Sequence, residues 1–72
     1  MTQNTILRLL DNERRRKGLS ERALAEKAGV GVTAYNHWML GITSPKLSTL
    51  IAIMGALDIE IVLRRRKNAD NG

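Results

Sequence analysis

Apolar residues recur every three or four positions along most of this chain, which is the spacing of helices that bury one side. The pattern predicts four helices, over about residues 2–17, 21–28, 32–40 and 44–57. The residues expected on their buried sides are Ile6, Leu9 and Leu10, then Ala23, Leu24, Tyr35, Trp38 and Met39, and finally Leu47, Leu50, Ile51, Met54 and Leu57. The predicted fold is an all-α, compact four-helix domain.

Polar residues, glycine and proline mark the expected ends of these helices. Thr2 or Asn4 can cap the first helix, and Ser20 is a favourable N-cap for the second. Gly29 can adopt the left-handed conformation that a sharp turn needs. Ser44-Pro45 reads as a cap followed by a proline at the first position of the fourth helix. The second and third helices are therefore expected to be joined by a tight turn, as in a helix-turn-helix.

The periodicity changes after Leu57, where apolar residues alternate with others, as is typical of a β-strand. One strand cannot form a sheet, so we expect it to pair with its copy in a second chain. The chain then divides into a helix-turn-helix domain over 1–58, a dimerisation strand over 59–67 and a disordered tail over 68–72. The expected dimerisation residues are Ile59, Ile61, Val62 and Leu63.

Positive charge is concentrated in two clusters, although the net charge of the whole chain is only +5. Residues 14–17 are all Arg or Lys, and so are residues 64–67, while the stretch between them is nearly neutral. Such clusters are expected where a protein follows a phosphate backbone. The alternatives are that the first cluster complements the negative end of a helix dipole and that the second is a solvated tail.

Several classes of function lack the residues that they need. The chain has no cysteine and one histidine, so it offers neither a disulfide framework nor a thiolate metal site. No glycine-rich phosphate loop or close carboxylate pair indicates catalysis, so we expect no enzyme and no cofactor. No apolar run reaches the roughly 20 residues of a membrane span, and no signal peptide is evident. We expect a cytoplasmic, nucleoid-associated protein that does not bind membranes.

A set of short sequence marks runs from Ile6 to Leu57. The marks are Gly18-Leu19-Ser20, Leu24-Ala25, Gly29-Val30, Trp38, Gly41, Ser44-Pro45 and the pattern of Leu47, Leu50 and Ile51. With this set, the stretch resembles the DNA-binding domain of the lambda-repressor-like (Cro/C1, XRE) helix-turn-helix family. The stretch from Leu57 to Arg66 is similar to the end of HipB-like antitoxins, in which a C-terminal strand pairs across a dimer. The resemblance implies binding to the major groove of double-stranded DNA.

The helix over 32–40 would then read the bases. Asn can form two hydrogen bonds with adenine, and Val or the Thr methyl group can touch a thymine methyl. The helix contains no Arg or Lys, so the commonest contact to guanine is absent and we expect an A·T-leaning code. The alternative is that its polar residues are ordinary solvated side chains. The candidate base-reading residues are Val32, Thr33, Ala34, Asn36 and His37.

Candidate phosphate contacts lie on both sides of this helix. In the family, an arginine at the position of Arg14 often pairs with an acidic residue at the position that Met39 occupies here. Arg14 is therefore expected to find Glu13, solvent or phosphate. Glu21 would repel a phosphate, which favours Arg22. The hydroxyls before the fourth helix could alternatively be ordinary caps. The full set is Arg14, Arg15, Arg16, Lys17, Ser20, Arg22, Thr43, Ser44 and Lys46.

These inferences predict a homodimeric, sequence-specific transcriptional regulator, of which a repressor reading an inverted repeat is the leading form. An alternative is an antitoxin that neutralises a partner toxin and regulates its own operon. A further alternative is an architectural DNA binder with little sequence preference, because the predicted reading helix lacks Arg and Lys.

Overall fold

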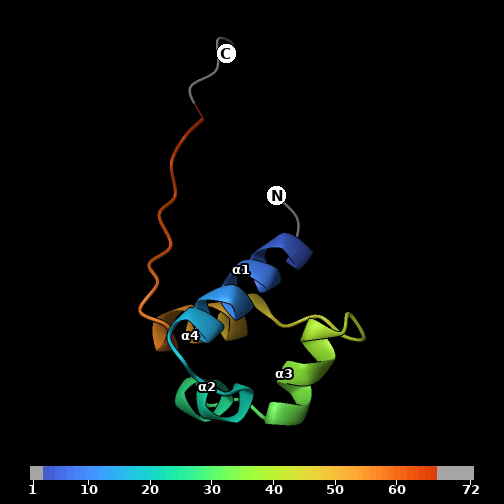
Figure 1. The fold of residues 1–72 in the computed structure, drawn as a ribbon. Helices are drawn as coiled ribbons and strands as arrows, with labels where there is room; N and C mark the ends of the chain where they lie inside the picture. The colour runs from blue at the N-terminus through green and yellow to red at the C-terminus, as the bar shows by residue number, and fades with distance from the viewer. Residues whose placement is uncertain (1–2, 67–72) are drawn as a thin grey trace.

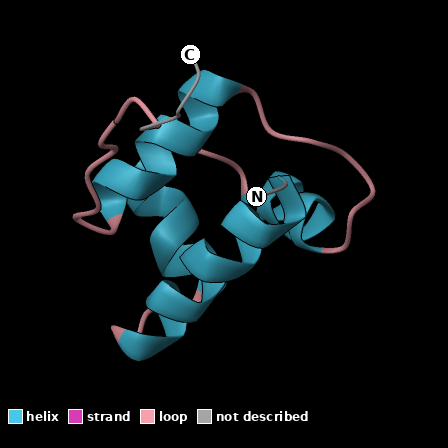
Figure 2. Cartoon of the chain, turned by 90° about the horizontal axis from the view of Figure 1, so that it is seen from above, coloured by secondary structure: helices cyan, strands magenta, loops and turns pink. Residues whose placement is uncertain are grey.

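The computed structural model describes residues 3–66 and shows four helices joined by loops (Figure 1). They are α1 (Gln3–Arg16), α2 (Glu21–Ala28), α3 (Val32–Met39) and α4 (Leu47–Ala56). In the view of Figure 1, α1 and α4 lie above α2, and α3 stands to one side. Every regular element of the described part is a helix, as Figure 2 shows from above, so the all-α, four-helix prediction is confirmed. None of these helices is long and apolar enough to cross a membrane.

The turn between α2 and α3 is built as the sequence predicts. The Ser20 hydroxyl accepts a hydrogen bond from the Ala23 amide at 3.0 Å, which satisfies one of the unpaired amides at the start of α2. At the end of α2, Gly29 has a φ of 77°, and the Val30 amide donates to the Ala25 carbonyl at 2.9 Å. A residue with a side chain is strained at this φ, so glycine lets the chain turn sharply into α3.

A single apolar core lies among the four helices. The core cluster consists of Leu7, Leu10, Leu24, Tyr35, Leu50, Ile53, Ala56 and Leu57. Leu24, Tyr35 and Ile53, one from each of three helices, have no exposed surface. Burying a large apolar side chain completely contributes about 1.5–3 kcal/mol relative to leaving it exposed, so these residues dominate the stability of the fold.

The two aromatic residues of the chain meet on the inner side of α3. The rings of Tyr35 and Trp38 are 6.5 Å apart between centroids and inclined by 66°, which is an edge-to-face contact. Tyr35 is fully buried, and Trp38 is half-buried and packs against the core cluster. The prediction that both rings belong to the core side of the helix is confirmed.

The buried sides of α1 and α4 differ from those predicted. Leu9 is 53% exposed and Leu7 takes its place in the core, while on α4 Leu47 and Ile51 are exposed and Ile53 is fully buried. In both helices apolar residues occupy neighbouring positions, so their period allows two rotations of the helix about its axis. Packing against the other helices selects one of them, and this information is not local to either helix.

The predicted start of α4 is also corrected. The first residue of α4 is Leu47 and its N-cap is Lys46, whose side chain forms no capping hydrogen bond. Ser44-Pro45 therefore lies in the preceding loop, where the proline is buried. Of the two candidate caps of α1, Thr2 is outside the described residues and Asn4 lies inside the helix. The other predicted ends agree within one residue, which is the normal uncertainty of helix boundaries.

The chain leaves the core through a turn after α4. Asp58 has a left-handed φ of 59°, and the Ile59 amide donates to the Met54 carbonyl at 2.8 Å, which places Ile59 against the core. Residues 60–66 are exposed and form an extended segment that ends far from α3 (Figure 1). The described part of this single chain contains no strand pairing, so the dimerisation strand stays a prediction. The end of that strand and the predicted tail lie outside the described residues.

Candidate nucleic-acid interface

The outer side of α3 carries three of the five predicted base-reading residues, Thr33, Asn36 and His37. Tyr35 is fully buried and defines which side of the helix faces the core. On a helix, residues 33, 36 and 37 share a side that points away from residue 35. Their contact with bases stays a prediction. Of the predicted set, Thr33 is exposed, while Val32, Ala34, Asn36 and His37 are half-buried in the free protein.

Asn36 is partly bonded to its own helix. Its side-chain amide nitrogen donates to the Val32 carbonyl at 3.1 Å. An amide nitrogen carries two hydrogens, so one donor and the amide oxygen remain for an adenine. The bond to Val32 therefore orients Asn36 without using up the groups that a base contact needs.

The structure corrects the predicted partner of Arg14. Its Nε donates to an Asp11 carboxylate oxygen at 2.9 Å, and its Nη1 donates to the Leu19 carbonyl at 2.7 Å. The side chain is only 11% exposed. Arg14 therefore turns inward and ties α1 to the connection before α2, and its carboxylate partner in the free protein is Asp11 and not Glu13. Its contact with phosphate stays a prediction.

Asp11 is the centre of this network, and the sequence analysis did not single it out. The oxygen that accepts from Arg14 also accepts a hydrogen bond from the Tyr35 hydroxyl at 2.8 Å, and the other oxygen lies 3.2 Å from Nε of Arg15. Partial burial raises the pKa of Asp11, but the hydrogen bonds from Arg14 and Tyr35 and the nearby positive charges outweigh it, so the pKa falls below its ordinary value of 3.8. The sequence feature that could have predicted the pair is the spacing of three residues between Asp11 and Arg14, which places two opposite charges next to each other on one helix.

The same contacts fix the protonation of the partners of Asp11. Burial, together with the hydrogen bond to Asp11, raises the pKa of the Tyr35 hydroxyl well above its ordinary value of 10.0. The hydrogen bond to Asp11 also raises the pKa of Arg14. At neutral pH the carboxylate is charged and both partners keep their protons, so the network holds one fixed pattern of donors and acceptor.

The other cations at the end of α1 pair with carboxylates at the surface. The side chains of Arg15 and Arg16 are each 70% exposed, and Arg16 donates to both carboxylate oxygens of Glu13. The hydrogen bond from Arg16 lowers the pKa of Glu13. Nζ of Lys17 lies 3.8 Å from a carboxylate oxygen of Asp58. Exposed pairs contribute little to stability, so these cations can exchange their carboxylates for phosphates.

Two further groups of predicted phosphate contacts lie near the ends of the helix-turn-helix. Ser20 and Arg22 stand at the start of α2; the Ser20 oxygen accepts the capping bond, and its own hydrogen remains available as a donor. Thr43, Ser44 and Lys46 are exposed in the loop before α4. Among the described residues, neither Arg22 nor Lys46 takes part in an ion pair. Both cations are therefore available to an anionic partner.

The loop after α3 also exposes apolar side chains that the sequence analysis did not anticipate. Leu40 is 73% exposed and Ile42 is 62% exposed. Apolar side chains cannot bond phosphate oxygens, so phosphate contact by this loop would rest on its hydroxyls, its lysine and its backbone amides.

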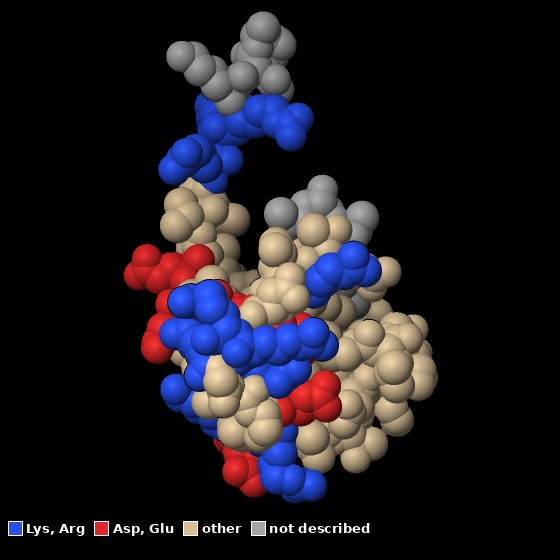
Figure 3. Space-filling model, viewed as in Figure 1, with Lys and Arg blue, Asp and Glu red and all other residues tan. Residues whose placement is uncertain are grey.

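The two basic clusters occupy separate places on the molecule. Figure 3 shows Lys and Arg side chains gathered over the end of α1 and, apart from them, at the end of the extended segment, where Arg64–Arg66 lie. In Figure 1 this segment and α3 lie on opposite sides of the helices. Within one chain, only the first cluster adjoins the helix-turn-helix.

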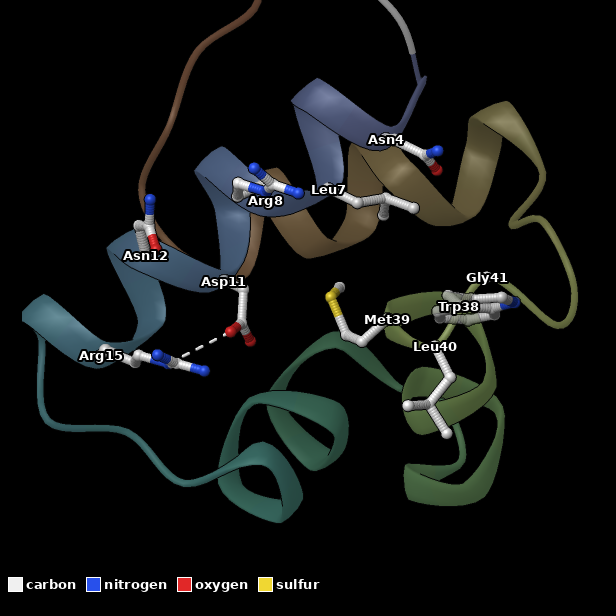
Figure 4. A pocket seen from close by; sticks show the side chains of 10 residues that line it. All are labelled: Asn4, Leu7, Arg8, Asp11, Asn12, Arg15, Trp38, Met39, Leu40 and Gly41. Carbon is white, nitrogen blue, oxygen red and sulfur yellow. Dashed lines mark ion pairs between the residues drawn. The ribbon is translucent and has the colours of Figure 1, made fainter.

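An open groove of about 460 Å³ separates the outer side of α1 from the end of α3 (Figure 4). Arg8, Asn12 and Arg15 of α1 line it, and Trp38–Gly41 form its other wall. Figure 4 shows Asp11 pointing from α1 into the space between the helices, with Arg15 beside it. Packing between α1 and α3 is sparse in consequence, and α3 packs chiefly against α2.

Comparison with known families agrees with this geometry. A family model described as helix-turn-helix (HTH_3) matches residues 10–63, which is most of the chain. The matched range includes α2, the turn, α3 and α4, together with the part of α1 that carries Asp11 and Arg14. No curated protein matches the chain.

Proposed function

Because the chain belongs to the Cro/C1-type (XRE) helix-turn-helix family of DNA-binding transcription regulators, we propose that it is a homodimeric repressor that reads an inverted repeat. The observation that supports this most directly is α3, whose Tyr35 is buried while Thr33 and Asn36 point away from the core side. A helix held in this way can lie in the major groove with its outer side against the base edges. The proposed activity is binding, without a catalytic step.

The reading side of α3 is proposed to recognise A·T-rich half-sites. Asn36 has the groups for a bidentate contact to adenine, and Thr33 and Val32 offer methyl groups to thymine. Since α3 contains no Arg or Lys, base contacts supply specificity, and most of the affinity is assigned to the DNA backbone. The proposed backbone contacts are Arg15, Arg16, Lys17, Ser20, Arg22, Thr43, Ser44 and Lys46.

The experiment that tests this proposal is the selection of bound duplexes from a random DNA pool by the purified chain at near-physiological salt. We expect an inverted repeat whose half-sites are about 10 base pairs apart, because two recognition helices of a dimer enter the groove about one turn apart. Enrichment of DNA without a motif would instead support backbone-driven binding with little specificity, which the lack of Arg and Lys in α3 favours. Recovery of no DNA would contradict both and direct the search to a protein partner, as in the antitoxin alternative.

Asn36→Ala is expected to relax base preference at one position of each half-site. The loss of a good bidentate contact lowers discrimination by about 1–3 kcal/mol. Asn36 bonds only its own helix, so the fold should survive the change. Competition between the selected duplex and single-base variants would measure the effect. The matched control is Asn12→Ala, which removes an exposed Asn from α1. Equal base preferences in the two variants would show that Asn36 does not read a base.

Dimerisation is proposed to use the extended segment after Ile59. Leu63 is 92% exposed and Val62 69%, and at the base of the segment Ile61, Leu9 and Met54 line a largely apolar groove. This apolar surface is more than a solvated tail requires, and a second copy could cover it by strand pairing. Ile59 packs against the core of its own chain and is therefore not needed for the pairing.

Deleting residues 61–72 is therefore expected to produce monomers, measured by sedimentation equilibrium at a concentration at which the full chain is dimeric. The matched control lacks only residues 67–72 and should stay dimeric because it retains the apolar segment. A dimer that persists after the longer deletion would show that the main contact lies elsewhere.

A further inference from the structure

The hydrogen bond between Tyr35 and Asp11 is the directional link between α3 and α1. Its length is 2.8 Å, and among the described residues no other side-chain hydrogen bond joins two helices. The remaining hold on α3 is apolar contact, mainly with α2. Apolar contact is non-directional. It therefore resists separation of the helices more strongly than it resists a small rotation of α3 about its own axis.

Rotation of α3 is the movement that base reading tolerates least. Thr33, Asn36 and His37 point away from the side that Tyr35 occupies, so turning the helix swings them across the base edges. The groove between α1 and the end of α3 leaves space for such a movement on that side (Figure 4). A bond at Tyr35, in the middle of α3, is therefore well placed to fix the rotation.

Asp11 is itself held from its own helix. Arg14 donates to the same oxygen that Tyr35 contacts and also to the Leu19 carbonyl, in the connection before α2. Arg15 lies against the other oxygen. A single carboxylate thus joins α1, the start of the helix-turn-helix and α3.

We propose that Asp11, through Tyr35, is a positioning residue that sets the orientation of the reading side of α3 relative to the basic end of α1. The inference rests on the proposed function, in which α1 contacts phosphates and α3 reads bases. Phosphate contacts fix the position and orientation of a protein on DNA. Base contacts can distinguish one sequence from another only if their donors and acceptors meet the base edges when the protein is in that position. The link between Asp11 and Tyr35 supplies this register.

The test is Tyr35→Phe, which keeps the buried ring and removes only the hydroxyl. Binding to the selected repeat and to an unrelated duplex is measured at the same salt, well below the unfolding temperature. We expect the ratio of the two affinities to fall by about tenfold, the scale of losing one base contact, with little change on the unrelated duplex. If both affinities fall by the same factor, or neither changes, the hydroxyl has only a structural role and the proposal is overturned.

Two further measurements separate this result from other causes. Asp11→Asn should lower the same ratio of affinities. In the double variant, the ratio should fall by less than the product of the two single effects, because both changes break the same hydrogen bond. Effects that multiply independently would contradict the proposal. Arg16→Gln is the control, since an exposed cation at the end of α1 should affect both duplexes equally. A wild-type chain that does not prefer its selected repeat would refute the proposed function itself, before any variant is compared.

Discussion

Replacing Leu24 by alanine is expected to lower the free energy of unfolding by about 2–5 kcal/mol, the range for a buried leucine truncated in a protein core. Leu24 has no exposed surface and lies in α2, which packs against both α3 and α4. A domain of 72 residues has a total stability of roughly 4–11 kcal/mol, so this one change removes a large part of it. Urea denaturation followed by circular dichroism, at fixed protein concentration, measures the loss.

The matched control for Leu24→Ala is Leu47→Ala. The sequence pattern assigned both residues to buried sides, but Leu47 is 69% exposed at the start of α4. Its truncation should change the free energy of unfolding by no more than about 0.5 kcal/mol, as is usual for surface positions. Equal losses in the two variants would contradict the helix rotation described for α4.

Arg14→Met is expected to destabilise the fold by about 2–3 kcal/mol without changing how DNA binding depends on salt. Methionine keeps a long apolar stem but leaves the Leu19 carbonyl without its donor and deprives Asp11 of its closest cation. Polar groups that lose their partners in a mostly buried place account for a loss of this size. The measurements are urea denaturation and the slope of the binding constant against salt concentration.

Arg16→Met provides the opposite control at the same end of α1. Its side chain is 70% exposed and pairs only with Glu13, so stability should change little. Because Arg16 is a proposed phosphate ligand, its removal should reduce the salt slope by about one unit. If Arg14→Met reduces the slope as much as Arg16→Met does, Arg14 contacts phosphate in the complex and its inward position belongs to the free protein alone.

The parts of the fold that local signals determine were predictable from the sequence. Ser20 caps α2, and Gly29 ends it in the left-handed conformation, because both effects depend on residues within a few positions of each other. The two short helices and the turn between them therefore agree with the prediction within one residue. Local spacing also explains why the inner side of α3 was predicted. Its large apolar residues Tyr35, Trp38 and Met39 all lie on one side of the helix.

The parts that depend on distant residues could not be predicted in this way. The rotations of α1 and α4 were wrong at Leu9 and Ile51 because each helix has two apolar sides of similar strength, and only the packed partner decides between them. The hydrogen bond between Asp11 and Tyr35 joins residues 24 positions apart, and a pairing at this distance cannot be predicted from the periodicity of either helix. The partner of Arg14, by contrast, lies only three positions away in α1, so its spacing from Asp11 was a local signal that the prediction of Glu13, solvent or phosphate left unused.

Trp38 gives the protein a built-in optical probe. It is the only tryptophan of the chain, it stands half-buried at the end of α3, and it forms one wall of the groove beside α1. Selective excitation of its indole therefore reports on one known site without an attached dye. Since Trp38 lies on the core side of α3, DNA in contact with the reading side would not stack on its ring. A change in its emission on DNA binding would thus indicate movement of α3 relative to α1. An unchanged spectrum would indicate that α3 already has, in the free protein, the orientation that it needs in the major groove.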